Sequence, residues 1–425
     1  MTARVRLFAL TAALVLSGCE GSGAHVVGPK GASAFTRYVA IGTSISMGVQ
    51  SGGVTASTQA QAWPALLAHA VGADFQIPFL RAPGCTPPLI APLLLGTDLA
   101  GASATSADTS CAGMLGTYTP PLNNVALSGA TAFAALNLTP RLVTAPQSGF
   151  SAGDRGRYAA VLGTTQSQVT AMLIEQPTFV SVELGANEVL GAVTTGLLLP
   201  ATSYTQSAPW TVMPAALFAP VYASIVDSVA LSKANALLVT VPKVAHVVSL
   251  RAGSELYADR ANLAAAGIVV AGDCNNSANL VFTAWLVPAL AANALASGTP
   301  QTLSCTDVSG AVDYVLTPAD VAALDGIVDQ MNAQIAGLAK QHGWALLDVN
   351  AVFGTIAAAR APYAVTTQLA CLNPYGQYVS LDGVHPNAAG QQLLANAAAE
   401  AVNAAYGYTI PTVPVAAQTA AQLCP

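Results

Sequence analysis

The stretch YVAIGTSISMG (38–48) holds the decisive pattern of this chain. Its first five residues form a nearly continuous apolar run that ends at Gly42, and Ser44 follows almost at once. Such a run is typical of a parallel strand that is covered on both faces. In α/β folds, functional side chains gather just past the carboxyl ends of these strands. Ser44 is therefore a candidate functional residue, although a helix N-cap is an equally ordinary role for a serine here.

Three further apolar runs predict strands of the same kind. They are TFVSVEL (178–184), ALLVTV (236–241) and WALLDV (344–349). Long helical patterns lie between them, and two are clear: one that begins at Thr317, and an Ala-rich one from about Ala388 to Tyr406. Strands that alternate with helices predict a layered α/β fold.

Composition narrows the function classes. Only 8% of the 425 residues are charged, the formal net charge is −6, and no basic run occurs. Because phosphate binding depends on clustered Lys and Arg, we do not expect a nucleic-acid partner.

The first residues predict export. MTARVRL carries two Arg and no acid, a short apolar run follows, and LSGC ends at Cys19. This is the pattern of a secretory signal over residues 1–18. LSGC also resembles the bacterial lipobox, which implies a lipid on Cys19 and attachment to a membrane of the cell envelope; an ordinary cleaved signal is the alternative. Residues 19–36 are then expected to be a flexible tether, with ordered structure from near Arg37.

The cysteine count is consistent with export. Without Cys19, six of the seven cysteines remain, which suggests disulfides and allows 15 pairings. Local pairing is the simplest hypothesis: 85–111, 274–305 and 371–424. No Cys or His cluster has the spacing of a zinc site, so we expect no structural metal.

A second chemical signal lies in LDGVHPNAAG (381–390). A serine nucleophile needs a base, and the base needs an orienting group. Asp382 could hold one ring nitrogen of His385 and leave the other for Ser44. The alternative is a capped turn in which Asp382 binds backbone amides. A rival nucleophile, Ser151 in GFSAG (149–153), lacks the preceding strand that a nucleophile elbow requires, and is read as a loop serine.

These segments resemble the SGNH (GDSL-type) hydrolase family in four blocks. Gly42-Thr43-Ser44-Ile45 corresponds to the first block, G-D-S-L. NVALSGATA (124–132) contains the glycine of the second block, Gly129. Gly185-Ala186-Asn187-Glu188 stands for G-x-N-D, and Asp382-Gly383-Val384-His385-Pro386 for D-x-x-H-P. The blocks occur in the family's order over nearly the whole mature chain. Thr43 and Glu188 each replace an Asp of the family pattern.

The resemblance implies a three-layer α/β/α, flavodoxin-like fold with a parallel sheet. It also implies roles: Ser44 as nucleophile, His385 as base, and Asp382 as orienting group. The oxyanion hole would consist of the backbone N–H groups of Ser44 and Gly129 with the side-chain amide of Asn187. This chemistry requires no metal or organic cofactor.

We therefore expect a single hydrolase domain over residues 37–425, with insertions near 191–232 and 247–316. The uncharged stretch 279–298 is long enough to span a membrane, but its small residues and Pro288 favour a buried helix pair or a lid over an acyl pocket. The expected activity is hydrolysis of small-molecule or lipid esters, as in a carboxylesterase or lipase. A polysaccharide O-acetyl esterase and a non-catalytic envelope lipoprotein on the same fold are the alternatives.

Overall fold

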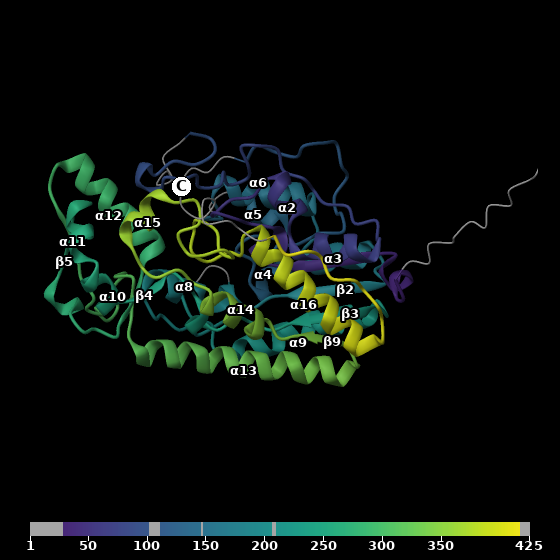
Figure 1. Ribbon diagram of the computed structural model, residues 1–425. Coiled ribbons are helices and arrows are strands. Elements are labelled where there is room, and N and C mark those ends of the chain that lie inside the picture. Colours follow the sequence, from purple (N-terminus) through teal and green to yellow (C-terminus); the bar gives the residue numbers. More distant parts are fainter. Residues whose placement is uncertain (1–28, 102–110, 146–147, 206–209, 417–425) are drawn as a thin grey trace, which may run out of the picture.

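A four-stranded parallel sheet forms the centre of the computed structural model, which describes residues 29–101, 111–145, 148–205 and 210–416 (Figure 1). The strand order is β1-β2-β3-β9. The bounds are β1 Tyr38–Gly42, β2 Phe179–Glu183, β3 Asn235–Val239 and β9 Ala345–Leu347. All four predicted strands are confirmed, and their nearly complete burial explains why their sequences are continuous apolar runs.

A fifth segment extends the sheet beside β1. Residues 123–127 run along its free edge: Ala40 N donates to Asn123 O, and the N–H groups of Val125 and Leu127 donate to Ala40 O and Gly42 O. The chain thus moves to one side of β1 and then crosses to β2 on the other side. With this segment included, the order is that of a flavodoxin-like sheet, whose ligand crevice lies at the carboxyl ends where the direction switches.

Helices cover both faces of the sheet, so the predicted three-layer α/β/α fold is confirmed (Figure 1). One layer contains α3 Trp63–Val71, α14 Val349–Ala358 and α16 Ala388–Tyr406; the other contains α4 Ala132–Asn137, α7 Gln168–Ile174, α9 Ala215–Leu231 and α13 Pro318–His342. The other helices of the main domain are α1 Ser44–Met47, α2 Ala56–Ala60, α5 Pro140–Val143, α6 Ala152–Leu162 and α8 Asn187–Thr195.

The two helices predicted from sequence occur as expected. Thr317 caps α13: its hydroxyl accepts from Asp320 N, and the Asp320 carboxylate accepts from Thr317 N in return. α16 has the predicted bounds, with Asn387 as its N-cap and the left-handed Gly407 at its end.

Residues 247–316 build most of a smaller lobe beside the sheet (Figure 1). It has its own apolar core, to which Val365 and Leu369 also contribute. Its strands are β4 Leu250–Ala252, β5 Ile268–Val270, β6 Leu280–Phe282, β7 Gln301–Leu303 and β8 Val315–Leu316; its helices are α10 Gly253–Ala258, α11 Arg260–Ala265 and α12 Thr283–Ser297, with α15 Val365–Ala370 packed alongside. The uncharged stretch 279–298 becomes β6 and α12 of this lobe, so neither a helix pair nor a lid forms from it.

The interpretation of 191–232 as an insertion is wrong for its second half. α9 is the crossover helix between β2 and β3, and Phe218, Tyr222 and Ile225 are fully buried in the main core. Prolines in this stretch are typical of loops, but Pro214 precedes the helix and Pro220 lies within its first two turns. The residues between α8 and α9 remain irregular in the described part.

The predicted tether also needs correction where it is described. Residues 32–35 form a short 3₁₀ helix, and Phe35 is fully buried. Its ring stacks on Phe179 of β2 with the centroids 4.0 Å apart. One aromatic residue in a Gly- and Ala-rich stretch thus ties residues 32–35 to the sheet. The signal segment and Cys19 lie outside the described residues.

Two predicted disulfides are present, Cys85–Cys111 and Cys274–Cys305. Cys371 is disulfide-bonded as well. Cys424 lies outside the described residues, so the 371–424 pair stays a prediction.

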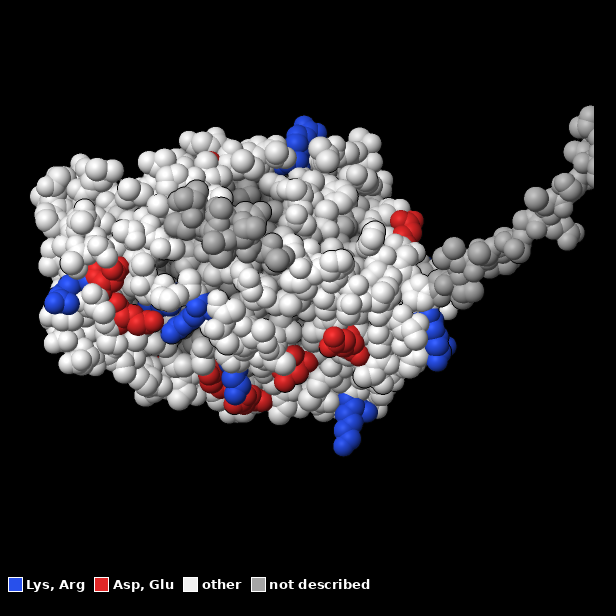
Figure 2. Space-filling model, viewed as in Figure 1, with Lys and Arg blue, Asp and Glu red and all other residues white. Residues whose placement is uncertain are grey.

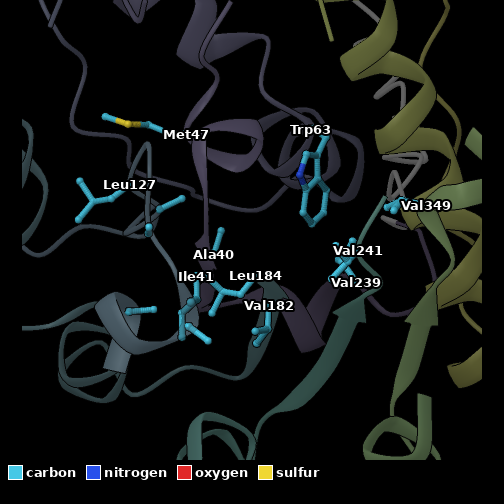
Figure 3. Close-up of a cluster of buried hydrophobic side chains, with 14 of the residues drawn as sticks. Ala40, Ile41, Met47, Trp63, Leu127, Val182, Leu184, Val239, Val241 and Val349 are labelled. Atoms are coloured by element: carbon cyan, nitrogen blue, oxygen red, sulfur yellow. The ribbon is translucent and has the colours of Figure 1, made fainter. Parts of the chain in front are cut away.

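A cluster of buried side chains supports the carboxyl ends of the strands, including Ile41, Val182, Val239 and Val241 with Trp63 of α3 (Figure 3). The surface in Figure 2 carries few charged side chains, as the composition predicts. Among the described helices, none has both the length and the apolarity needed to cross a membrane.

Candidate active site

Ser44 lies at the carboxyl edge of the sheet, two residues beyond β1. The helix N-cap is its neighbour Thr43, whose hydroxyl accepts from Ile45 N, so Ser44 is the first residue of α1. The N-cap alternative for Ser44 is therefore wrong. The residue is only 6% exposed and lines a pocket.

Ser44, His385 and Asp382 form one hydrogen-bonded chain. The Ser44 Oγ to His385 Nε2 distance is 2.8 Å, and the His385 Nδ1 to Asp382 Oδ2 distance is also 2.8 Å. With Nδ1–H donating to the carboxylate, Nε2 is left to accept the Ser44 hydroxyl proton. This is the arrangement of a nucleophile, a base and an orienting acid.

The turn before α16 sets the position of the acid and the base. Asp382 Oδ1 accepts from Val384 N at 2.9 Å and from His385 N at 2.8 Å, while Oδ2 holds the imidazole. The capped turn and the orienting role, which the sequence offered as alternatives, therefore occur together. Gly383 has a φ of +71°, and a Cβ there would lie 2.6 Å from Ser249 Cβ, so only glycine fits this turn.

Burial and charge shift these two groups in opposite directions. Burial alone would raise the pKa of Asp382, but the positive charge of His385 and three hydrogen bonds, from the side chain and backbone of His385 and the backbone of Val384, hold that pKa below its usual value. Burial alone would lower the pKa of His385, but the Asp382 charge and hydrogen bond, with a contribution from the Glu183 charge, raise it above 6.5. The pair thus stabilises an imidazolium, which a base must become during catalysis.

A pH profile tests this coupling. A protonated His385 cannot accept the Ser44 proton, so kcat/KM for an ester should rise with pH, with its midpoint above 6.5. Asp382→Asn should move the midpoint downward and lower kcat by roughly 10²–10⁴. Asp227→Asn, an exposed change on α9, is the control and should alter neither quantity. An unmoved midpoint in Asp382→Asn would contradict the coupling.

The structure brings two of the three predicted oxyanion-hole residues into one pocket. Asn187, the first residue of α8, lines it together with Ser44 and His385. The side-chain amide of Asn187 donates to Ala130 O at 2.8 Å, which joins α8 to the turn that contains Gly129. Gly129 has a φ of +76° and lines an adjoining hollow that also includes Asn187. Gly129 itself is not part of the wall of the pocket that contains Ser44.

The two departures from the family pattern have defined places. The Thr43 hydroxyl donates to the buried carboxylate of Glu183, 2.8 Å from Oε1. Glu188 is fully buried, and its Oε1 accepts from Ala132 N at 2.7 Å and from the Tyr204 hydroxyl. Burial raises the pKa of Glu188 to about 7, although these hydrogen bonds oppose the rise. Glu188 thus attaches α8 to the start of α4, just after Gly129.

The pocket above Ser44 is lined mainly by apolar side chains. Valine, leucine, isoleucine and phenylalanine residues from five regions of the chain form its wall: Ile45, Val189, Leu190, Val193, Val244, Val247, Val248, Phe353, Ile356, Val379 and Val384. Polar groups are confined to the catalytic residues and to Thr43, Asn187, Lys243 and His246. No residue of the stretch 279–298 lines it.

The rival serine has a structural role. Ser151 is the N-cap of α6, where its hydroxyl accepts from Asp154 N at 3.0 Å and donates to the Asp154 carboxylate at 2.7 Å. The segment before it contains no strand in its described part.

Sequence reasoning missed the buried groups that hold the Ser44 turn. Glu183 accepts hydrogen bonds from Thr43 and Ser46, and the Gln391 amide of α16 donates to Ile45 O at 3.1 Å. For Glu183 a signal existed, because an acid at the end of an otherwise apolar buried strand needs a compensating environment. Gln391 carried no such signal.

Comparisons with known proteins give distant structural likenesses only. No family model matches the chain, and no curated protein matches it. A variant of an acetyl-xylooligosaccharide esterase from Geobacillus is 13% identical, with 86% of this chain and 93% of that chain covered, at a TM-score of 0.35. A putative GDSL-like lipase from Parabacteroides merdae is 11% identical, with 87% and 97% covered, also at 0.35.

An α/β hydrolase from the metagenome of Lake Arreo in Spain is 15% identical, with 87% of this chain and 94% of that chain covered, again at a TM-score of 0.35. These scores are low, so the description of the fold rests on the sheet and layers of this chain itself.

Proposed function

We propose that this chain is a serine esterase of the SGNH (GDSL-type) family, which hydrolyses carboxylic esters through an acyl-Ser44 intermediate. The observation that carries the proposal is the hydrogen-bonded chain Ser44–His385–Asp382 at the wall of an apolar pocket. A capped turn alone would not require His385 Nε2 to face a serine hydroxyl at 2.8 Å.

The chemistry proceeds in two steps. Ser44 Oγ attacks the ester carbonyl carbon while His385 Nε2 takes its proton; the bond to the alkoxy oxygen then breaks, and His385 returns the proton to the leaving alcohol. Water next attacks the acyl-enzyme with His385 again as base, which releases the carboxylic acid and restores Ser44. The Asn187 amide and the N–H groups of Ser44 and Gly129 are the proposed donors to the oxyanion, each worth about 10²–10³ in rate.

The wall of the pocket favours a hydrophobic acyl group. Apolar side chains such as Val193, Val247 and Ile356 surround the space next to Ser44, and burying each CH₂ of an acyl chain there gains about 0.8 kcal/mol. We therefore propose esters of longer acyl chains as the substrate class.

Removing the nucleophile tests the reaction. Ser44→Ala should lower ester hydrolysis by about 10³-fold or more, because the acyl intermediate can no longer form. A fluorophosphonate probe should label the wild type and not the variant, and peptide mapping should place the label on Ser44. Ser151→Ala is the matched control and should keep both the ester hydrolysis and the labelling of the wild type. Turnover by Ser44→Ala at the wild-type rate would show that Ser44 is not the nucleophile.

A series of p-nitrophenyl esters, together with acetylated xylan, tests the acyl preference. We expect kcat/KM to increase from acetate to medium-length chains. Val247→Trp, which fills part of the pocket, should lower kcat/KM for octanoate by about 10-fold or more while acetate changes little, since several CH₂ groups lose their contacts. Val269→Trp in the smaller lobe is the control. Activity confined to acetyl groups on the glycan would instead indicate a polysaccharide O-acetyl esterase.

We further propose that the chain is exported and held on a membrane of the cell envelope by a lipid on Cys19. The charged start, the short apolar run and LSGC support this. In cells fed a labelled fatty acid, the wild type should incorporate label and fractionate with membranes. Cys19→Ala should lose the label and leave the membrane fraction, because a lipid chain provides the binding energy. A Cys19→Ala protein that stays on the membrane would contradict the anchor.

A further inference from the structure

Glu183 lies buried next to the nucleophile, outside the catalytic chain. It is the last residue of β2, its partner in the register is Gly42 of β1, and it is 5% exposed. Among the described residues, no Lys, Arg or His forms an ion pair with it. A buried carboxylate without a cation must be compensated by hydrogen bonds.

In the described part of the chain, every hydrogen bond to the Glu183 carboxylate comes from the turn that contains Ser44. Glu183 Oε2 accepts from Thr43 N at 3.0 Å and from Ser46 N at 3.3 Å. The hydroxyls of the same two residues also donate to it, Thr43 Oγ1 at 2.8 Å to Oε1 and Ser46 Oγ at 2.9 Å to Oε2. The carboxylate therefore binds the backbone on both sides of Ser44, and Glu183 is not among the residues that line the pocket above Ser44.

The surrounding packing leaves the turn little freedom. A Cβ at position 42 would lie 3.1 Å from Glu183 Oε2 and 2.6 Å from Ser46 Oγ, so the absence of a side chain at Gly42 allows the turn to close over the carboxylate. Trp63 Nε1 donates to Ser46 Oγ at 3.1 Å. Burial raises the pKa of Glu183, and the hydrogen bonds from Thr43 and Ser46 oppose that rise.

We infer that Glu183 is a positioning residue, which fixes the Thr43–Ser46 turn so that Ser44 Oγ stays in line with His385. The inference rests on the proposed function. It also gives Thr43 a structural role. Thr43 replaces the Asp of the family pattern, and its N–H and hydroxyl groups donate to the carboxylate of Glu183 on the neighbouring strand β2. An error of about 1 Å in the placement of a reacting group can lower a rate by roughly 10²-fold.

Two variants separate the hydrogen bonds from the charge. Glu183→Gln keeps one oxygen for the Thr43 and Ser46 N–H groups, and its amide can donate to the Thr43 hydroxyl, so the turn stays held without a charge. Glu183→Leu removes every acceptor at similar volume. On a short p-nitrophenyl ester, we expect Glu183→Leu to lower kcat by about 10²-fold with little change in KM. The kcat of Glu183→Gln should be at least about 10-fold higher than that of Glu183→Leu.

Active sites are counted by titration with a fluorophosphonate, and each turnover rate is divided by that number to give kcat per site. The rate of fluorophosphonate labelling is measured in the same variants. A purely structural role would lower the melting temperature or the titratable fraction and leave kcat per site unchanged. Ser181→Ala is the matched control, because it removes another buried polar group of β2, the partner of the Tyr38 hydroxyl, and should leave kcat per site unchanged.

If Glu183→Leu does not fold, Glu183→Asp decides the question together with Glu183→Gln. Asp keeps the charge but does not reach the turn, so we expect Glu183→Gln to retain the higher kcat; the reverse order would overturn the inference. Wild-type kcat per site in Glu183→Leu, with Ser44→Ala inactive, would also overturn it and leave the proposed function intact. Turnover by Ser44→Ala would instead refute the proposed function.

Discussion

The parallel register of β1 and β2 is the constraint on which the site depends. Gly42 pairs with Glu183, so the two strands end at the same level. Ser44 then lies two residues past one strand end, and Asn187 lies four residues past the other. The segment 123–127, bonded along β1, brings Gly129 to the same edge. A shift of one residue would turn the Glu183 side chain to the opposite face and leave the Ser44 turn without its acceptor.

The base reaches this edge from the far end of the chain, and contacts outside the sheet hold it there. Gln391 of α16 donates to Ile45 O and accepts from Trp63 N, so the helix that follows His385 is attached to the helix that follows Thr43. The turn after α1 makes a second attachment, because Ser51 N donates to Ser380 Oγ at 2.8 Å. Together these contacts fix a distance between two segments that lie more than 300 residues apart in the sequence.

Continuous apolar runs were sufficient to predict the four strands, because burial on both faces leaves little room for polar residues. The Ser44, Asp382 and His385 constellation was also predictable, since each lies in a short motif with chemical meaning. The irregular appearance of 191–232 was misleading, because Pro214 is the N-cap of α9, where the missing N–H costs no hydrogen bond within the helix, and a proline there looks like part of a loop. The pocket wall and Gln391 were beyond sequence reasoning, since their roles arise only when distant segments pack together.

Three buried carboxylates surround this site in a chain with only 20 acidic residues. Each one accepts backbone N–H groups from a different segment: Glu183 from Thr43 and Ser46, Glu188 from Ala132, and Asp382 from Val384 and His385. These segments carry the nucleophile, the proposed oxyanion donor and the base. Only Asp382 faces a group that becomes cationic, which explains why its pKa alone is lowered while those of the two glutamates are raised by burial. Ionisable groups with shifted pKa values concentrate at functional sites, and here each of them also fixes the backbone of one part of the machinery.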